Sequence, residues 1–301
     1  MSARNSVDYP ASVFFRSAFC LLPDRISVMR LTLPGKVLGA LLALLLTAGC
    51  QADQPSAAAP SADQPVAAHQ AEPYVLHLPG IAGLLPVDES LMRGLRDGGV
   101  TGTIVCYDWT AEDRGLRALS DSVRHARQAE VVAQILAEIR RNEPDRPVYL
   151  IGHSGGAGIA VWALERLPAD VMIRGLILLA PALSPTYDLR PALSHVDGQA
   201  YALVSEHDPV LAATRWFGTI DRVNVEAAGR VGFVPPEGVE TYDNLVQVPY
   251  RREWIKYGHI GDHIGMMTSR FAAAILAPLI TGETDAAPEL AGSSQDSHDR
   301  H

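Results

Sequence analysis

The sequence predicts an α/β fold, with a mostly parallel sheet of about six strands and helices on both faces. Two patterns support this fold class. Short runs of β-branched and other apolar residues alternate along the chain with longer runs of helical periodicity. The predicted strands are apolar almost throughout, which is typical of parallel strands buried on both faces. Strands and helices that alternate in this way build a parallel sheet with helices packed over it.

The predicted elements follow one another in chain order. Strands are expected at residues 74–78, 101–107, 148–151, 175–179, 200–205 and 245–248. Helices are expected at residues 89–97, 123–142, 157–167, 210–217 and 269–277. The longest of these helices shows the pattern most clearly, because its apolar residues recur at helical spacing and polar residues occupy the opposite face.

Charge and cysteine content exclude some classes of protein. The formal net charge is -9 and the basic residues form no cluster, so a nucleic acid is not an expected partner. The three cysteines provide no disulfide framework, because Cys20 and Cys50 lie in or before the predicted signal region. Cys106 lies on a predicted strand, where we expect a buried free thiol.

Residues 1–49 have the features of an upstream segment followed by a secretory signal peptide. Arg30 and Lys36 form a short basic start, residues 37–46 are almost wholly apolar, and small residues precede Cys50. The apolar run is too short to span a bilayer comfortably as a helix. Because the signal is complete from Met29 onward, Met29 is a candidate for the true start.

The rest of the chain divides into a body and two polar flanks. Residues 50–72 are rich in Ala, Pro, Ser and Gln, a composition that predicts a tether. Residues 281–301 are rich in Ala, Ser, Asp and His, which predicts a disordered tail rather than a metal site. Residues 73–280 between them have the length of one domain with its own core.

The most informative motif is a G-x-S-x-G pattern directly after the third predicted strand. Ser154 stands at its centre, with Gly152 and Gly156 on either side. A serine hydroxyl reacts as a nucleophile when it stands at a sharp turn between a strand and a helix, and glycines allow the backbone to make that turn. The pattern also lacks the spacing of glycine-rich phosphate loops. It therefore nominates Ser154 as a nucleophile.

With this motif in this order of elements, the chain resembles the α/β-hydrolase family over residues 73–280, apparently without its first antiparallel strands. In that family the acid and then the histidine follow the nucleophile along the chain. The resemblance implies that Asp208 is the acid, with Glu206 as the alternative, and that His263 is the base, with His259 as the alternative. A second interpretation of Asp208 is that it caps the helix after it.

The resemblance also implies an oxyanion hole made of two backbone N–H groups. One belongs to Gly155, directly after the nucleophile, and the other to Ile81 in the loop after the first strand. That loop is similar to the family's His-Gly-x loop, with Pro79 in place of the histidine. His153 is expected to support the elbow by packing, and His77 could border the pocket.

The N-terminal region carries a second resemblance. The small residues before Cys50 resemble the lipobox of bacterial lipoproteins, which implies that Cys50 is diacylated and becomes the mature N-terminus. Gln51 in the next position implies an outer-membrane destination. The expected location is therefore the bacterial cell envelope, with the domain lipid-anchored to the outer membrane and facing the periplasm.

Taken together, these features predict a serine hydrolase that cleaves small-molecule or lipid esters through a Ser-His-Asp triad, without a cofactor or a metal ion. Acyltransferase and thioesterase chemistry use the same site, and a noncatalytic lipoprotein that binds a ligand or a partner is the alternative from another class. The oligomeric state is left open. Two long connections, residues 182–198 and 218–244, carry side chains that could line an acyl pocket. These are Tyr187, Leu189, Leu193, Val231, Phe233 and Val234.

Overall fold

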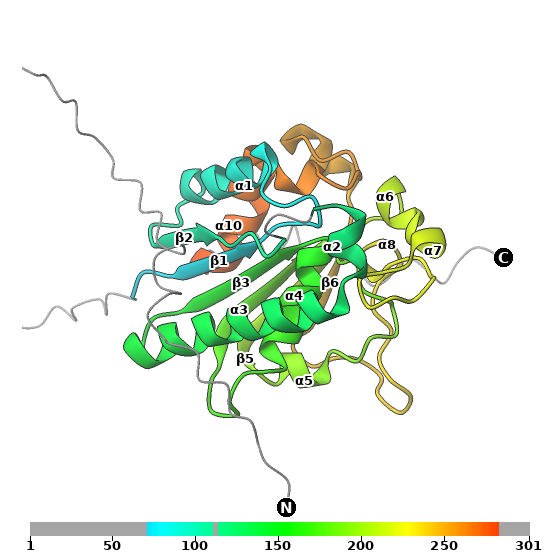
Figure 1. Ribbon diagram of the computed structural model, residues 1–301. Helices are drawn as coiled ribbons and strands as arrows, with labels where there is room; N and C mark the ends of the chain where they lie inside the picture. The colour runs from blue at the N-terminus through cyan, green and yellow to red at the C-terminus, as the bar shows by residue number, and fades with distance from the viewer. Residues whose placement is uncertain (1–70, 111–113, 283–301) are drawn as a thin grey trace, which may run out of the picture. The chain divides into compact units, whose positions relative to one another are not determined.

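The computed structural model describes residues 71–110 and 114–282, which contain a six-stranded sheet (Figure 1). The strand order is β2-β1-β3-β4-β5-β6, and every neighbouring pair is parallel. The strands are β1 (Tyr74–Leu78), β2 (Thr103–Cys106), β3 (Val148–His153), β4 (Ile173–Leu179), β5 (Val196–Val204) and β6 (Leu245–Pro249). The predicted fold class, with six parallel strands, is confirmed.

Helices cover both faces of the sheet, as Figure 1 shows. One face carries α1 (Pro86–Asp97) and the C-terminal run of α9 (Ser269–Phe271), a π-helical segment (Ala272–Leu276) and α10 (Ala277–Thr281). The other face carries α3 (Ser122–Asn142) and α4 (Gly155–Leu164). Each layer of helices hides one side of the strands from water.

Alternate residues of each strand enter opposite cores, because side chains along a strand point to opposite faces. Val75 of β1 belongs to the cluster that includes Leu91 of α1 and Phe271 of α9. Its neighbour Leu76 belongs to the cluster that includes Leu136 of α3. Burial on both faces explains why the strands read as continuous apolar runs in the sequence.

Two of the predicted helices differ in detail. The helix expected at residues 210–217 is two short helices, α6 (Pro209–Ala212) and α7 (Thr214–Phe217). The Thr214 hydroxyl lies 2.6 Å from the Leu211 carbonyl and 2.7 Å from the Val225 carbonyl, which ties the break to the connection that follows. The last helix includes the π-helical segment and runs on to Thr281.

Short helices that the sequence pattern did not predict lie in the connections. They are α2 (Leu116–Ser120), α5 (Arg190–Leu193), α8 (Ala228–Val231) and the 3-10 helices Arg252–Tyr257 and Gly265–Met267. Each has six residues or fewer, so none is long enough to show a clear apolar stripe. No helix among the described residues is long and apolar enough to cross a bilayer.

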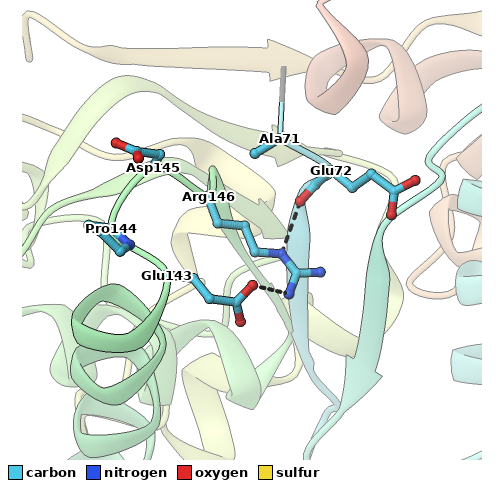
Figure 2. Close-up of a pocket in the computed structure, with 6 residues that line it drawn as sticks. All are labelled: Ala71, Glu72, Glu143, Pro144, Asp145 and Arg146. Carbon is cyan, nitrogen blue, oxygen red and sulfur yellow. Dashed lines mark hydrogen bonds and ion pairs between the residues drawn. The ribbon is translucent and has the colours of Figure 1, made fainter. Parts of the chain in front are cut away.

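Arg146 fastens the start of β1 to the loop before β3, at the amino ends of the strands (Figure 2). Its Nε donates to the Glu72 carbonyl at 2.9 Å, its Nη1 to Glu143 Oε2 at 2.9 Å and its Nη2 to Thr103 Oγ1 at 2.6 Å. Glu72, Glu143 and Arg146 border a hollow of about 450 Å³. Because Ser154 follows the opposite end of β3, this hollow does not hold the candidate nucleophile.

The loop after β1 is held to α1 by a buried polar pair. His77 Nε2 lies 2.7 Å from Asp88 Oδ1, and both side chains are almost fully buried. The other oxygen, Asp88 Oδ2, accepts the Leu85 N–H at 2.8 Å. His77 was expected to border the pocket, but it pairs with α1 instead. Asp88 therefore fixes both ends of the loop that carries Ile81.

Cys106 is the last residue of β2. It is a free thiol and only partly buried. Burial, followed by the negative charges of Asp88 and Asp108, raises the pKa of this thiol. The thiol therefore stays protonated at neutral pH, when it is a poor nucleophile.

Asp88→Ala should lower the free energy of unfolding by about 3 kcal/mol, because it leaves a buried imidazole and a loop N–H without their partner. Chemical denaturation measures this change. Glu89→Ala, which changes the exposed neighbour on the same helix, is the matched control and should have little effect. Equal stability of the Asp88 variant and the parent would contradict this role for the pair.

Candidate active site

β3 leads directly into a strained turn at Ser154, and α4 begins at the next residue. The backbone of Ser154 has φ 53° and ψ -119°, a conformation that non-glycine residues rarely adopt. Its N–H donates to the Leu179 carbonyl of β4 at 2.9 Å, and its carbonyl accepts the Ala182 N–H at 3.1 Å. Such anchoring holds the serine in a conformation that its local sequence would not choose alone.

The flanking glycines are required by close backbone contacts. A Cβ on Gly152 would lie 2.6 Å from Ala157 Cα, and a Cβ on Gly156 would collide with the carbonyl oxygens of Leu78 and Pro79. Neither neighbour is a flexible side chain that can move aside. The G-x-S-x-G motif thus packs the first turn of α4 against both β3 and the end of β1.

His263 and Asp208 form a close buried pair at the carboxyl end of the sheet. His263 Nδ1 lies 2.6 Å from Asp208 Oδ2, and the Asp208 side chain is fully buried. The other oxygen, Oδ1, accepts the N–H groups of Val210 and Leu211 at 2.9 and 3.0 Å. With a proton on Nδ1 donated to Asp208, His263 keeps a lone pair on Nε2 for proton transfer.

The two interpretations of Asp208 are therefore compatible. One carboxylate oxygen caps α6, as the Asp-Pro sequence suggested, and the other holds His263. Capping fixes the plane of the carboxylate, which in turn fixes where its second oxygen points. The short helix α6 after β5 therefore orients the Asp208 carboxylate toward His263.

The alternative acid and base lie elsewhere. The Glu206 side chain is 81% exposed, and its carboxylate lies 3.7 Å from His207 Nε2. His259 is almost fully buried, stacked on Trp254 and in edge contact with Phe271. Burial lowers the pKa of His259, although the Asp262 carboxylate opposes the shift. The geometry favours Asp208 and His263 over these two residues.

His153 joins the turn at Ser154 to His263, the candidate base. Its Nε2 donates to the His263 carbonyl at 3.0 Å, and the two rings are 4.9 Å apart between centroids. Burial, and next the nearby charge of His263, lower the pKa of His153 to about 3. Within the described residues Ser154 Oγ makes no hydrogen bond, and such catalytic bonds are often long before substrate binds.

The loop after β1 lies against the elbow where an oxyanion hole is expected. A Cβ on Gly80 would be 3.4 Å from the Ser154 Cβ, and the Ile81 side chain crowds the Gly155 Cα. Trp109 Nε1 donates to the Pro79 carbonyl at 2.7 Å and holds the loop from behind. The first N–H groups of a helix have no partner within it, and the Ile81 N–H makes no hydrogen bond within the described residues.

Three contacts of the site were not anticipated from the sequence. Ile220, in the connection before α8, packs against Gly155, with its Cδ1 3.3 Å from where a Cβ on Gly155 would stand. Ser184 Oγ donates to Asp221 Oδ2 at 2.5 Å. This hydrogen bond joins the two long connections, residues 182–198 and 218–244. Asp108 binds the loop through the Leu84 N–H at 3.2 Å. Long-range contacts of this kind leave no signal in local sequence pattern.

The side chains expected to line an acyl pocket do not gather at Ser154. Leu189, Leu193 and Phe233 are buried in the core with α4, while Val231 and Val234 are exposed. Tyr187 donates to Glu165 Oε1 at 2.8 Å and accepts from Trp162 Nε1. Across residues 71–110 and 114–282, no three His, Cys, Asp or Glu side chains are grouped so as to hold a metal ion.

Residues 112–213 match a family model described as serine aminopeptidase, S33. This stretch includes the elbow at Ser154 and reaches past Asp208, and it lies on the sheet of six parallel strands. The chain has the fold of an α/β hydrolase. The resemblance inferred from the sequence is confirmed, and hydrolase chemistry is supported at this coarse level. No curated protein matches the sequence.

Several solved structures are similar to this chain at low identity. A lipase-esterase related protein from Clostridium acetobutylicum is 12% identical, with TM-score 0.42, over 71% of this chain and 95% of that one. The type II thioesterase BorB of the borrelidin cluster is 17% identical, with TM-score 0.39, over 71% and 92%. Dienelactone hydrolase from Anabaena variabilis is 16% identical, with TM-score 0.38, over 72% and 87%. At these values the likeness carries no information about substrate.

The buried His153 should make the hydrolase domain less stable in mild acid. Its pKa is about 3 when folded and about 6.5 when unfolded, so only the unfolded chain binds the proton between these values. Stability is full above pH 6.5 and falls as the pH drops below it, by about 2 kcal/mol at pH 5. His153→Gln should remove this loss, as measured by urea denaturation at pH 7 and pH 5.

His207→Gln changes an exposed histidine on a neighbouring loop and is the control for that experiment. It should follow the parent at both pH values. A parent-like loss of stability in His153→Gln between pH 7 and pH 5 would contradict the neutral, buried state of His153.

Proposed function

We propose that this protein is a serine hydrolase that cleaves acyl esters, with Ser154 as nucleophile, His263 as general base and Asp208 as the acid that orients it. The observation that carries the proposal is the 2.6 Å contact between His263 Nδ1 and the buried Asp208, beside a serine held at positive φ. A merely structural serine would not need a strained backbone, and strain of this kind clusters at functional sites.

In the acylation step His263 Nε2 takes the proton of Ser154 Oγ as the oxygen attacks the ester carbonyl. The imidazolium that forms is stabilised by the Asp208 carboxylate, which is held in place by hydrogen bonds to Val210 and Leu211 and faces His263 Nδ1. His263 then gives the proton to the leaving alcohol, and an acyl-serine remains. Water attacks this acyl group in a second step, with His263 again as base.

The negative charge that develops on the carbonyl oxygen is stabilised by the N–H groups of Gly155 and Ile81. Both groups belong to rigid backbone: Gly155 opens α4, and Ile81 lies in the loop fastened by Asp88 and Trp109. His153 contributes by staying neutral, because a second positive charge beside the imidazolium would oppose its formation.

An ester is the proposed substrate, since its alkoxide leaving group is easier to displace than an amine. The same groups would cleave a thioester in place of an ester. They would also transfer the acyl group to an alcohol if an alcohol replaced water in the second step. The family model that matches is described as an aminopeptidase, so amide cleavage is the competing activity within this proposal. A noncatalytic domain that binds a ligand is the competing function from another class.

We also propose that the domain is attached to a membrane of the bacterial cell envelope through a lipid on Cys50. The predicted signal, Cys50 and the predicted tail lie outside the described residues, apart from the short ends 71–72 and 281–282. The sequence alone supports this part: a basic start, an apolar run and small residues directly before the cysteine. The outer membrane facing the periplasm is the proposed destination.

Ser154→Ala and His263→Ala should each lower kcat/KM for a short-chain p-nitrophenyl ester by at least about 1,000-fold, because each removes one partner of a single proton-transfer unit. Ser184→Ala is the matched control for the nucleophile. Ser184 is also a buried serine, and its hydroxyl donates to the carboxylate of Asp221. His259→Gln is the control for the base. Both controls should keep parental kcat/KM, measured at a temperature where each variant is folded.

Each contrary outcome has a distinct meaning. Loss of activity in the His259 variant with retention in the His263 variant would reverse the assignment of the base. Hydrolysis of an aminoacyl anilide without hydrolysis of esters would place the protein with the peptidases. A well-folded parent that turns over no acyl substrate would favour the noncatalytic alternative.

Cys50→Ala should move the protein from the membrane fraction to the soluble fraction after expression in a bacterial host, because the acyl chains would be lost. Cell fractionation followed by immunoblotting measures the distribution. Cys106→Ala, which removes the free thiol of the folded domain, is the control and should stay with the membrane. Retention of both variants in the membrane fraction would contradict lipid attachment at Cys50.

A further inference from the structure

Exposed apolar side chains are concentrated on the loops that carry the candidate site. The described residues include fourteen large hydrophobic side chains that are exposed, and seven of them lie on the three loops, with their short helices, that follow β1, β5 and β6. These loops carry Ile81, Asp208 and His263 respectively. We call the seven side chains the apolar collar. They are Leu84, Leu85, Val210, Trp216, Phe217, Ile260 and Ile264, each 40–68% exposed.

The collar lies on segments that follow the carboxyl ends of three strands, β1, β5 and β6. The pair Asp208–His263 joins two of its loops, because Val210 donates its N–H to Asp208 and Ile264 follows His263. The third loop follows β1 and lies against Ser154 through Gly80. Figure 1 shows α6 and α7 near the end of the sheet toward which the strands run, while β1 starts at the other end. The collar therefore borders the candidate nucleophile.

High exposure separates the collar from the lining of a pocket. A side chain that lines a binding cleft is partly covered by the opposite wall, whereas these side chains are open to water. Keeping so many large apolar groups exposed around one site is unfavourable unless another apolar phase covers them. The collar thus has the features of a contact surface rather than those of a cavity.

Trp216 and Phe217 are the most exposed aromatic side chains of the described residues and stand next to each other on α7. The Arg215 guanidinium lies over the Trp216 ring, 4.1 Å from its centroid, and is also 3.4 Å from Glu226. An aromatic pair with an adjacent cation suits the boundary between lipid headgroups and acyl chains, where amphipathic rings concentrate. We therefore expect a lipid surface, rather than a soluble protein, to cover the aromatic pair and its adjacent cation.

We infer that the apolar collar docks on a lipid surface and so brings the candidate nucleophile to ester substrates held in a membrane. The part of this inference that concerns lipid esters rests on the proposed ester hydrolysis. Seventy residues precede Ala71, and twenty separate Cys50 from Ala71. A tether of that length, which the composition of this segment predicts, would span about 25 Å on average as a random coil and about 70 Å when fully extended. An anchored domain can therefore turn its collar to the bilayer.

Trp216 provides a direct test, because it is far more exposed than Trp109 and Trp254, which are buried. The full-length chain is bound to phosphatidylcholine vesicles with or without bromine on the acyl chains, and tryptophan emission is compared. Bromine quenches an indole only at contact range. A domain that is attached to the vesicle only through its N-terminal lipid therefore shows equal emission on the two kinds of vesicle. Trp216 is one of four tryptophans, so we expect the emission on brominated vesicles to be lower by up to about a quarter, and Trp216→Phe to abolish most of the difference.

Phe217→Asp should reduce the quenching at least twofold, whereas Val246→Asp, an exposed valine on β6 outside the collar, should leave it unchanged. Equal emission of the parent on the two kinds of vesicle would overturn the inference, as would equal quenching in the two aspartate variants. If Phe217→Asp instead converts a dimer to a monomer in gel filtration and leaves quenching intact, the collar belongs to a second copy of the chain. The readout needs no turnover, so it is independent of whether the ester proposal holds.

Discussion

The buried carboxylate of Asp208 is the contact on which the organisation of the site depends. It accepts two backbone N–H groups with one oxygen and faces His263 with the other. A charge with no exposure to water is tolerated only when its hydrogen bonds are satisfied. The end of β5, the first turn of α6 and the histidine loop must therefore keep their relative positions, or the carboxylate loses its partners.

The strain at Ser154 is balanced by the same kind of long-range contact. The backbone conformation costs about 1–3 kcal/mol. Hydrogen bonds from Ser154 to Leu179 and Ala182, together with the packing of Gly156 under the end of β1, hold it in place. His153 then connects this rigid turn to the His263 carbonyl. Two independent restraints, one through Asp208 and one through His153, fix the position of the base.

Sequence reasoning predicted the elements that depend on local pattern. The six strands and the helices of both faces were predicted with the right order, because their apolar periodicity follows from burial on the sheet. The strained turn at Ser154 was predicted because glycines on both sides of a serine, directly after a buried strand, allow the backbone to turn sharply into a helix. The predicted acid and base were named from family order, and their geometry is compatible with that choice.

Other features depend on contacts between distant parts of the chain. The break after Ala212 follows from Thr214, whose hydroxyl lies close to a carbonyl eleven residues ahead. The pairing of His77 with Asp88 places a polar pair in the core, which no local pattern marks. The apolar side chains of the two long connections were expected to line a pocket. Leu189 and Phe233 are instead part of the core, where they belong to the same buried cluster as residues of α4.

The most direct test of the account is to locate the covalent adduct that a fluorophosphonate forms with the full-length protein. Intact mass measures the stoichiometry, and fragmentation of the peptide that contains residues 148–166 identifies the modified atom. The account predicts a single adduct on Ser154 that fails to form when His263 is replaced by alanine. An adduct on another serine, or undiminished modification of the His263 variant, would contradict the assignment of nucleophile and base.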